Sequence, residues 1–205
     1  MSDLPSPKDV LDFWFGALGS DGNVSPDVAA RWWRKSDDFD AEIRQRFGAL
    51  HTAATTTPES VEHWLSTPEG AVALTIVLDQ FSRNLGRDTP AAFAHDGQGL
   101  SVMEQALERG HWDALADLHR YFLVMPAMHS EDLAVHAAGA THFAAARDQA
   151  RSEATREALT QAGDFLKRHT VIIERFGRYP HRNAILGRTS TEAERAYLED
   201  GGETF

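Results

Sequence analysis

The feature that most constrains this chain is a set of helix starts that recurs through its first half. At five places a Ser or Thr stands directly before a Pro: Ser6-Pro7, Ser25-Pro26, Thr57-Pro58, Thr67-Pro68 and Thr89-Pro90. A Ser or Thr hydroxyl caps the free N–H groups of a helix, and Pro fits the first helical position because its missing N–H would have no partner there. Glycine favours the left-handed residue that ends a helix. The candidate ends are Gly16, Gly110, Gly177 and Gly187.

These starts and ends predict helices along the whole chain. Ser36 before two acidic residues adds one start, and a capping box from Thr191 to Glu194 adds another. The predicted helices span 7–15, 26–34, 37–54, 58–65, 68–85, 90–109, 112–125, 131–149, 152–176, 181–186 and 191–199. No stretch alternates apolar and polar residues as a strand does. We expect an all-α fold in one domain, 1–205, with antiparallel neighbours in a bundle or a solenoid of helix pairs.

Charge and composition restrict the partners and the compartment. The 205 residues carry a formal net charge of -11, which repels phosphate backbones and anionic lipid, so neither nucleic acid nor membrane is an expected partner. The absence of cysteine excludes disulfides, thiolate metal sites and a cysteine nucleophile. The polar start lacks the regions of a signal peptide, which predicts a cytoplasmic protein. The apolar stretch 71–78 is far shorter than the roughly 20 residues of a membrane span and predicts a core helix.

The end of the predicted helix 68–85 changes abruptly from apolar to polar. Asp79 and Arg83 stand four residues apart, and Gln80 and Asn84 form a second such pair. Asp79 shares a helix face with apolar residues, so it is expected to be buried and to require a partner, for which Arg83 is the nearest candidate. Two interpretations remain open, a structural ion pair at a helix end and a ligand site lined by these four residues.

A second polar group is the sequence His129-Ser130-Glu131-Asp132. Pro126 is expected to interrupt the preceding helix, and Ser130 to cap the next one with two acids in its first turn. Capping leaves His129 unexplained, and an imidazole beside carboxylates fits acid–base chemistry. Asp132 and His136, four residues apart, suit two metal ligands, but no zinc signature occurs, so we predict no metal and no cofactor.

The third group is the basic segment 167–188, which holds six Lys and Arg residues against the single acid Glu174. Such asymmetry indicates either an anion site or a face that docks on the acidic remainder of the chain. Arginine dominates, which suits recognition of carboxylate or phosphate. His169 lies on the apolar face of its helix and is expected to be a hydrogen-bonded core residue.

With these residues in view, the chain resembles a widespread bacterial family, a domain of unknown function in the tetratricopeptide-like helical superfamily. The resemblance rests on the following motifs: Val10 to Gly16 (VLDFWFG), Arg31-Trp32-Trp33, Leu78 to Asn84 (LDQFSRN), His129 to Asp132 (HSED), Arg178 to Asn183 (RYPHRN) and Leu186-Gly187-Arg188. The family usually has Pro where this chain has Ser82. The resemblance implies stacked antiparallel helices, a tetratricopeptide-like α/α superhelix without the repeat consensus. It implies no reaction.

Three polar groups from distant segments are most simply explained by one shared pocket. The leading hypothesis is a pocket for an anionic small molecule, with hydrolysis or group transfer as the reaction. The catalytic candidates are His129, Glu131 and Asp79, and the ligand-binding candidates are Gln80, Arg83, Asn84, Arg175, Arg178, His181, Arg182 and Asn183. The alternative is a tetratricopeptide-like module that binds a protein or peptide without catalysis. A third interpretation is that the arginines only neutralise buried acids.

Overall fold

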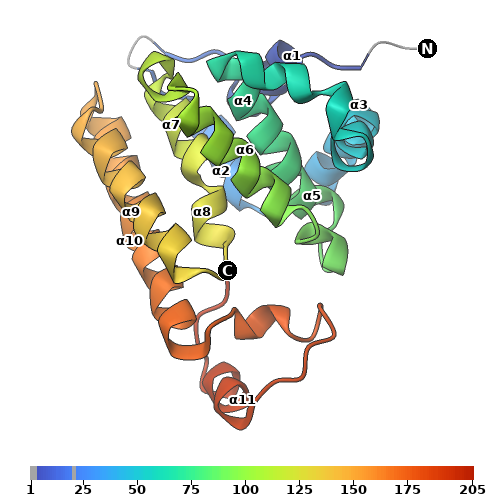
Figure 1. Ribbon diagram of the computed structural model, residues 1–205, viewed down its shortest axis with the longest axis vertical. Coiled ribbons are helices and arrows are strands. Elements are labelled where there is room, and N and C mark those ends of the chain that lie inside the picture. The colour runs from blue at the N-terminus through green and yellow to red at the C-terminus, as the bar shows by residue number, and fades with distance from the viewer. Residues whose placement is uncertain (1–3, 20–21) are drawn as a thin grey trace.

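The computed structural model describes residues 4–19 and 22–205, and these ranges fold into helices without any strand (Figure 1). The all-α prediction is therefore confirmed, whereas the superhelical arrangement stays a prediction. The α-helices are α1 (Pro7–Phe15), α2 (Pro26–Trp33), α3 (Asp37–Thr56), α4 (Pro68–Thr75), α5 (Ser82–Leu85), α6 (Asp96–Glu108), α7 (Asp117–Val124), α8 (Pro126–His129), α9 (Leu133–Asp148), α10 (Glu153–Phe176) and α11 (Glu192–Glu199).

Three of the five Ser/Thr-Pro pairs cap α-helices as predicted. The hydroxyls of Ser6, Ser25 and Thr67 accept hydrogen bonds from the backbone N–H three residues later. Thr57 and Thr89 make no such bond and precede 3-10 turns, η1 (Pro58–Ser60) and η4 (Pro90–Ala92). Pro fixes φ but does not choose between 3-10 and α hydrogen bonding.

Three predicted helix boundaries are wrong, two of them because a Pro begins a 3-10 turn there. The segment 58–65 forms the two 3-10 turns η1 and η2 (Glu62–Ser66), and the helix predicted from residue 90 begins at Asp96. The helix predicted from residue 112 begins at Asp117, after the 3-10 turn η5 (His111–Ala114). All four predicted glycine ends have positive φ, from 63° to 73°.

The segment predicted as one helix, 68–85, runs through the centre of the molecule. Its first part, α4, packs against α1, α6 and α7, and residues 70–82 are buried. The helix is continuous but widens into a π-helical segment, η3 (Ile76–Phe81), before α5. π-helical turns are frequent at functional sites. Here the turn carries Asp79 and Gln80, two of the predicted site residues.

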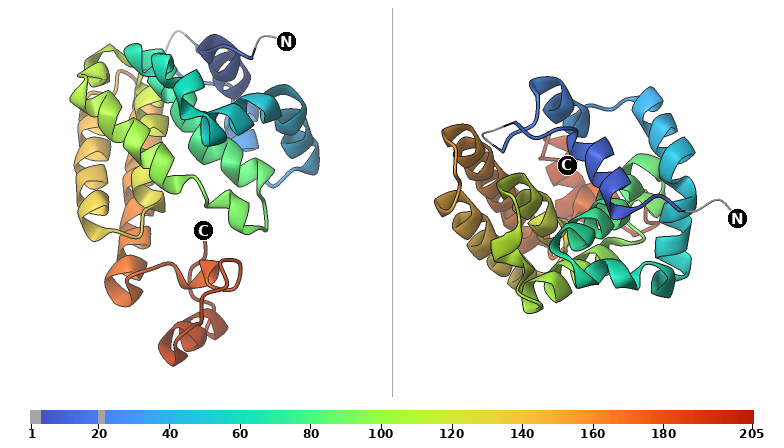
Figure 2. Two further views of the ribbon diagram at one scale, coloured as in Figure 1. Left: turned by 45° about the vertical axis from the view of Figure 1, so that its right-hand side comes forward. Right: turned by 90° about the horizontal axis from the view of Figure 1, so that it is seen from above.

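The helices α7 to α10 carry the chain from the core to the C-terminal residues. Pro126 stands where α7 gives way to the short α8, and α9 and α10 pack along each other (Figures 1 and 2). The N-cap of α9 is Asp132, whose carboxylate accepts from Ala134 N at 2.8 Å, while Ser130 Oγ accepts from Asp132 N. The predicted Ser130 cap is therefore wrong by two residues.

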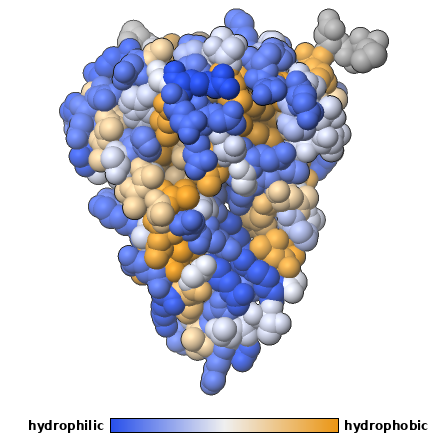
Figure 3. Space-filling view, viewed as in Figure 1, coloured by the Kyte–Doolittle hydropathy of each residue, from blue (hydrophilic) through white to orange (hydrophobic). Residues whose placement is uncertain are grey.

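Most of the residues after α10 lie below the main body in Figure 1, and the chain end turns back, so that Phe205 packs against Phe165 and His169 of α10. Residues 177–205 contain the 3-10 turn η6 (Pro180–Arg182), where a helix over 181–186 was predicted, and α11, which Thr191 caps as predicted. Figure 3 shows a largely hydrophilic face with smaller hydrophobic patches between the body and these residues. Within the described ranges, no helix has the length and apolar character to cross a membrane.

Candidate functional site

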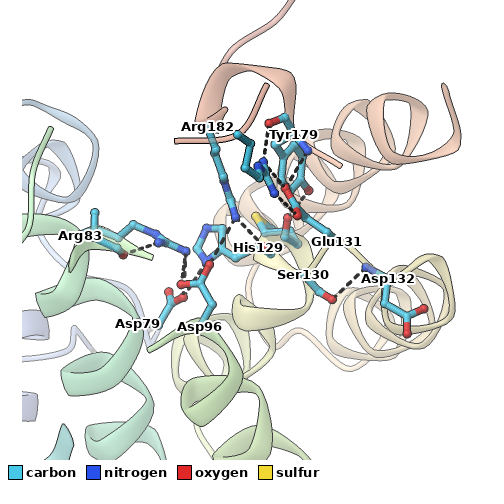
Figure 4. Close-up of polar contacts among 12 residues, drawn as sticks. Asp79, Arg83, Asp96, His129, Ser130, Glu131, Asp132, Tyr179 and Arg182 are labelled. Atoms are coloured by element: carbon cyan, nitrogen blue, oxygen red, sulfur yellow. Dashed lines mark hydrogen bonds and ion pairs between the residues drawn. The ribbon is translucent and has the colours of Figure 1, made fainter. Parts of the chain in front are cut away.

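The structure brings together one side chain from each of the three predicted polar groups. Asp79 from η3, His129 from α8 and Arg182 from η6 meet beside Asp96, the first residue of α6 (Figure 4). His129, Arg182 and Asp96 line a cavity of about 320 Å³, and Asp79 lies behind His129. The cavity is lined by Pro90, Phe93, Ala94, Asp96, Gly97, Leu100, Pro126, His129, Ser130, Glu131, Arg182 and Leu186. The predicted convergence of these three groups therefore takes the form of a small cavity with a polar wall.

Asp79 is fully buried at the back of this wall. Its Oδ1 accepts a hydrogen bond from His129 Nδ1 at 2.6 Å, and its Oδ2 accepts one from Gln80 Nε2 at 2.6 Å. Arg83 Nη2 lies 3.6 Å from Oδ1. Burial alone would raise the pKa of Asp79, but His129, Arg83 and Gln80 together hold this pKa well below its usual value. Asp79 is therefore an ionised carboxylate that orients the imidazole.

His129 presents its other ring nitrogen to the cavity. The side chain is 16% exposed and lines the cavity, and no side chain or carbonyl of the described residues bonds Nε2. An ionised carboxylate accepts hydrogen bonds but cannot donate one, so the neutral ring must carry its proton on Nδ1, the nitrogen that faces Asp79. Nε2 then carries the lone pair, the arrangement that a carboxylate–histidine pair uses for general acid–base work.

Two arginines and Asp96 form the charged part of the wall. Arg83 Nη2 lies 2.8 Å from Asp96 Oδ1, and Arg182 Nη1 lies 3.3 Å from Asp96 Oδ2. Both guanidinium groups also stack on the ring of Phe93. Arg182 is 6% exposed, and its Nε has no hydrogen-bond partner among the described residues. Sequence reasoning missed Asp96, because it lay inside the predicted helix 90–109 and not at a helix start.

The backbone that carries His129 is fixed at three successive carbonyls. Tyr179 OH donates to Met128 O at 2.6 Å, Arg182 Nη1 donates to His129 O at 3.0 Å, and His136 Nε2 donates to Ser130 O at 2.8 Å. Sequence reasoning named His136 only as a metal candidate and did not single out Tyr179, although Tyr179 belongs to the RYPHRN motif. Within the described residues, no group of three or more His, Asp or Glu could hold a metal ion.

Glu131 lines the cavity, but its carboxylate is engaged elsewhere. Arg188 donates to both of its oxygens, at 2.7 and 3.0 Å, and Tyr179 N donates to Oε1 at 2.8 Å. Burial acts to raise the pKa of Glu131, but these donors lower it overall. Glu131 therefore ties α8 to residues 179–188, and the geometry leaves the proton-handling position to His129.

Two further candidates in the basic segment lie beside the cavity wall. Asn183 is buried and bonds Ser190 and Arg188. His181 packs beside Tyr179, with ring centroids 5.5 Å apart, and neither of its ring nitrogens has a hydrogen-bond partner in the described ranges. Burial, with Arg182 nearby, lowers the pKa of His181 to about 4.

The remaining candidates lie away from the cavity. Asn84 donates to Asp40, which also pairs with Arg87. Arg178 forms a two-point ion pair with Glu194, at 2.6 and 2.8 Å. Arg175 is exposed and stacks on the rings of Phe176 and Tyr197. Asn84, Arg175 and Arg178 therefore lie apart from the other candidates. The structure brings together Asp79, Gln80, Arg83, His129, Glu131 and Arg182.

The similarity of this chain to known proteins includes all the residues of this site. The model of the family described as "Bacterial protein of unknown function (DUF924)" matches residues 10–202. The chain is also similar to a solved structure of a protein of unknown function from Agrobacterium tumefaciens, with 33% sequence identity and a TM-score of 0.76. That similarity covers 95% of this chain and 97% of the other. No curated protein matches the chain.

Proposed function

The chain belongs to this bacterial family of unknown function, and we propose that its cavity binds a small anionic molecule with which His129 exchanges a proton. The observation that carries the proposal is the hydrogen bond from His129 Nδ1 to Asp79, 2.6 Å long, which leaves Nε2 at the cavity. A buried carboxylate that orients one imidazole nitrogen and leaves the other available is the geometry of a general acid–base group.

The neighbours of His129 favour water as the nucleophile. The nearest hydroxyl in the sequence, that of Ser130, accepts a hydrogen bond from Asp132 N and makes none to the imidazole. With no side-chain nucleophile bonded to Nε2, water is the nucleophile that attacks the ligand, and the protonated ring would donate its Nε2 proton to the leaving group. The proposed reaction is accordingly hydrolysis, the transfer of a group to water, and its substrate is a phosphate- or carboxylate-bearing metabolite.

The lining of the cavity supports a ligand with one polar end. Arg182 and the imidazole lie on the polar side, whereas Phe93, Leu100 and Leu186 offer apolar surface to the body of the ligand. A volume of about 320 Å³ falls at the lower end of the range of small-molecule sites, roughly 300–1,000 Å³. A folded partner or a long peptide does not enter a cavity of this size, which favours a small molecule. If no anion binds, the alternative is a protein-binding module.

The proposal is tested by melting the protein with sulfate, phosphate or acetate. A ligand at ten times its dissociation constant stabilises the native state by roughly 1.4 kcal/mol, which raises the melting temperature by roughly 3–5 °C for a protein of this size. We expect a saturable rise that Arg182→Lys weakens, because the shorter ammonium cannot reproduce the guanidinium contacts. The matched control is Arg175→Lys on the exposed face of α10. No saturable shift with any of the three anions would contradict an anion-binding cavity.

A further inference from the structure

The charged side chains around the cavity balance one another. Three acids face three arginines in pairs or bridges, with shortest nitrogen–oxygen separations of 2.7 to 3.6 Å. The acids are Asp79, Asp96 and Glu131, and the arginines are Arg83, Arg182 and Arg188. With His129 neutral, the wall therefore carries no net formal charge.

An anion that enters this balanced wall adds uncompensated negative charge. Burying a charge without compensation is unfavourable. Asp96 already pairs with the guanidinium groups of both Arg83 and Arg182. An additional positive charge at the cavity would remove this penalty. The group that can supply it is one that can accept a proton and whose added proton would point at the ligand.

His129 meets both conditions. Its Nε2 faces the cavity without a partner from the described residues, and a protonated imidazole donates from both ring nitrogens. Nδ1–H would keep its bond to Asp79, and Nε2–H would point at the anion. The ring takes up one positive charge 2.6 Å from a carboxylate that is already ionised.

Apart from the charged pairs of the wall, the other titratable groups that face His129 favour their neutral forms. Burial lowers the pKa of His169 to about 3 and of His181 to about 4. Burial also lowers the pKa of His136 and raises the pKa of Tyr179, so His136 resists protonation and the phenol stays protonated. His95 precedes α6, but its ring faces His51 at a centroid distance of 5.5 Å. His129 is therefore the group in the cavity wall that can take up a proton when an anion binds.

We infer that the cavity binds a small oxyanion together with a proton, which His129 takes up at Nε2. The inference rests on the proposed function, because it requires the anion to occupy this cavity. Above the pH at which His129 is protonated in the free protein, the affinity for the anion falls by up to about tenfold per pH unit. The linkage is reciprocal, so the bound anion raises the affinity of His129 for its proton by the same factor.

Sulfate is the probe that tests this coupling, because it stays a dianion between pH 6 and pH 8. Isothermal titration calorimetry in two buffers that differ in ionisation enthalpy measures the protons taken up with each sulfate. At pH 8 we expect uptake to approach one proton per sulfate, with sulfate binding up to about tenfold tighter at pH 7 than at pH 8. His129→Gln should abolish the uptake, because the amide can donate to Asp79 but does not titrate.

The control variant is His63→Gln, whose exposed ring lies on the 3-10 turn η2 and outside the cavity lining; it should retain the full uptake. Equal sulfate affinity from pH 6 to pH 8 without proton uptake would overturn the coupling and leave the anion-binding cavity standing. Uptake that survives in His129→Gln would overturn the assignment to this ring. Absence of sulfate binding at every pH would overturn the proposed function itself.

Discussion

At the scale of single residues, the role of each charged side chain depends on which opposite charge it meets. Arg178 and Arg182 stand four residues apart in the same basic segment. The side chain of Arg178 is 28% exposed and pairs with Glu194. The side chain of Arg182 is buried and contacts Asp96 and the carbonyl oxygen of His129. Only the second of these positions is part of the cavity wall.

Arg182→Ala is expected to destabilise the protein strongly. Removing one partner of a buried ion pair typically lowers stability by about 3–5 kcal/mol. Because Asp96 keeps Arg83 as a partner, we expect a loss near the lower end, about 3 kcal/mol, in urea unfolding. Arg175→Ala is the matched control, and the loss of its exposed ring contacts should lower stability by less than about 1 kcal/mol. Equal effects of the two variants would contradict the burial of Arg182 in this wall.

Sequence reasoning found the residues whose surroundings are visible in the sequence. Asp79 stands out because it lies in an apolar stretch, and His129 because helix capping does not explain it. The partners of Asn84 and Arg178 lie 44 and 16 residues away, and no local pattern distinguishes these side chains from Arg83 and Arg182. Asp96 was missed because a helix start at residue 96 carries no Ser, Thr or Pro signal.

At the scale of elements, the position of His129 depends on how closely α9 approaches α8. Gly139 lies in α9, and a Cβ added there would come 2.6 Å from the Cβ of Ala127, two residues before His129. Atoms in contact this closely cannot both stay in place. The absence of a side chain at residue 139 is therefore a condition for the observed position of α8.

Gly139→Ala is expected to destabilise the protein, although alanine favours helices. Overpacking typically lowers stability by about 1–3 kcal/mol, whereas replacing a mid-helix glycine contributes roughly 0.5–1 kcal/mol in the opposite direction. Gly163 in α10 is the control, because an added Cβ meets no heavy atom within 4 Å there. Gly163→Ala should stabilise by roughly 0.5–1 kcal/mol in urea unfolding. A stabilising Gly139→Ala would contradict the close packing of α8 and α9.

The elements that the sequence predicted well are those that a side chain caps. Helices α1, α2, α3, α10 and α11 begin within one residue of their predicted starts. The 3-10 turns at Pro58 and Pro90 were predicted as α-helices, because Pro at the first position fits both. The π-helical segment 76–81 has no residue signal, since its hydrogen-bond pattern depends on packing in the core.

At the scale of the whole molecule, the basic segment balances acids of the protein as well as lining a cavity. Arg178 pairs with the buried Glu194 and Arg188 with the part-buried Glu131, so the interpretation that the arginines neutralise buried acids fits the first contact and partly the second, whereas Arg168 pairs with the exposed Glu203. The same region gathers His169 and His181, and His51 is half-buried beside Ser82. Burial lowers the pKa of His51 to about 4.

These histidines make stability depend on pH. Their pKa values in the folded state, about 3 to 4, lie below the unfolded value of 6.5. Below pH 6.5 the unfolded chain therefore binds more protons than the native state, and stability falls as the pH drops toward 4. Each ring that stays neutral contributes up to about 1.4 kcal/mol per pH unit in this window. The urea midpoint should decrease steadily from pH 7 to pH 5, and a midpoint that stays constant or rises over this interval would contradict the burial of these rings.

Asp79 holds the Nδ1 proton of His129 and leaves Nε2 available at the cavity. The most direct test is a long-range ¹H–¹⁵N correlation spectrum of the imidazole nitrogens at pH 8, with the His129 signals assigned by their absence in His129→Gln. The neutral ring should carry its proton on Nδ1, and sulfate at pH 7 should shift the Nε2 signal toward that of a protonated nitrogen. A neutral ring protonated on Nε2, with an Nδ1 signal unaffected by Asp79→Asn, would contradict the account.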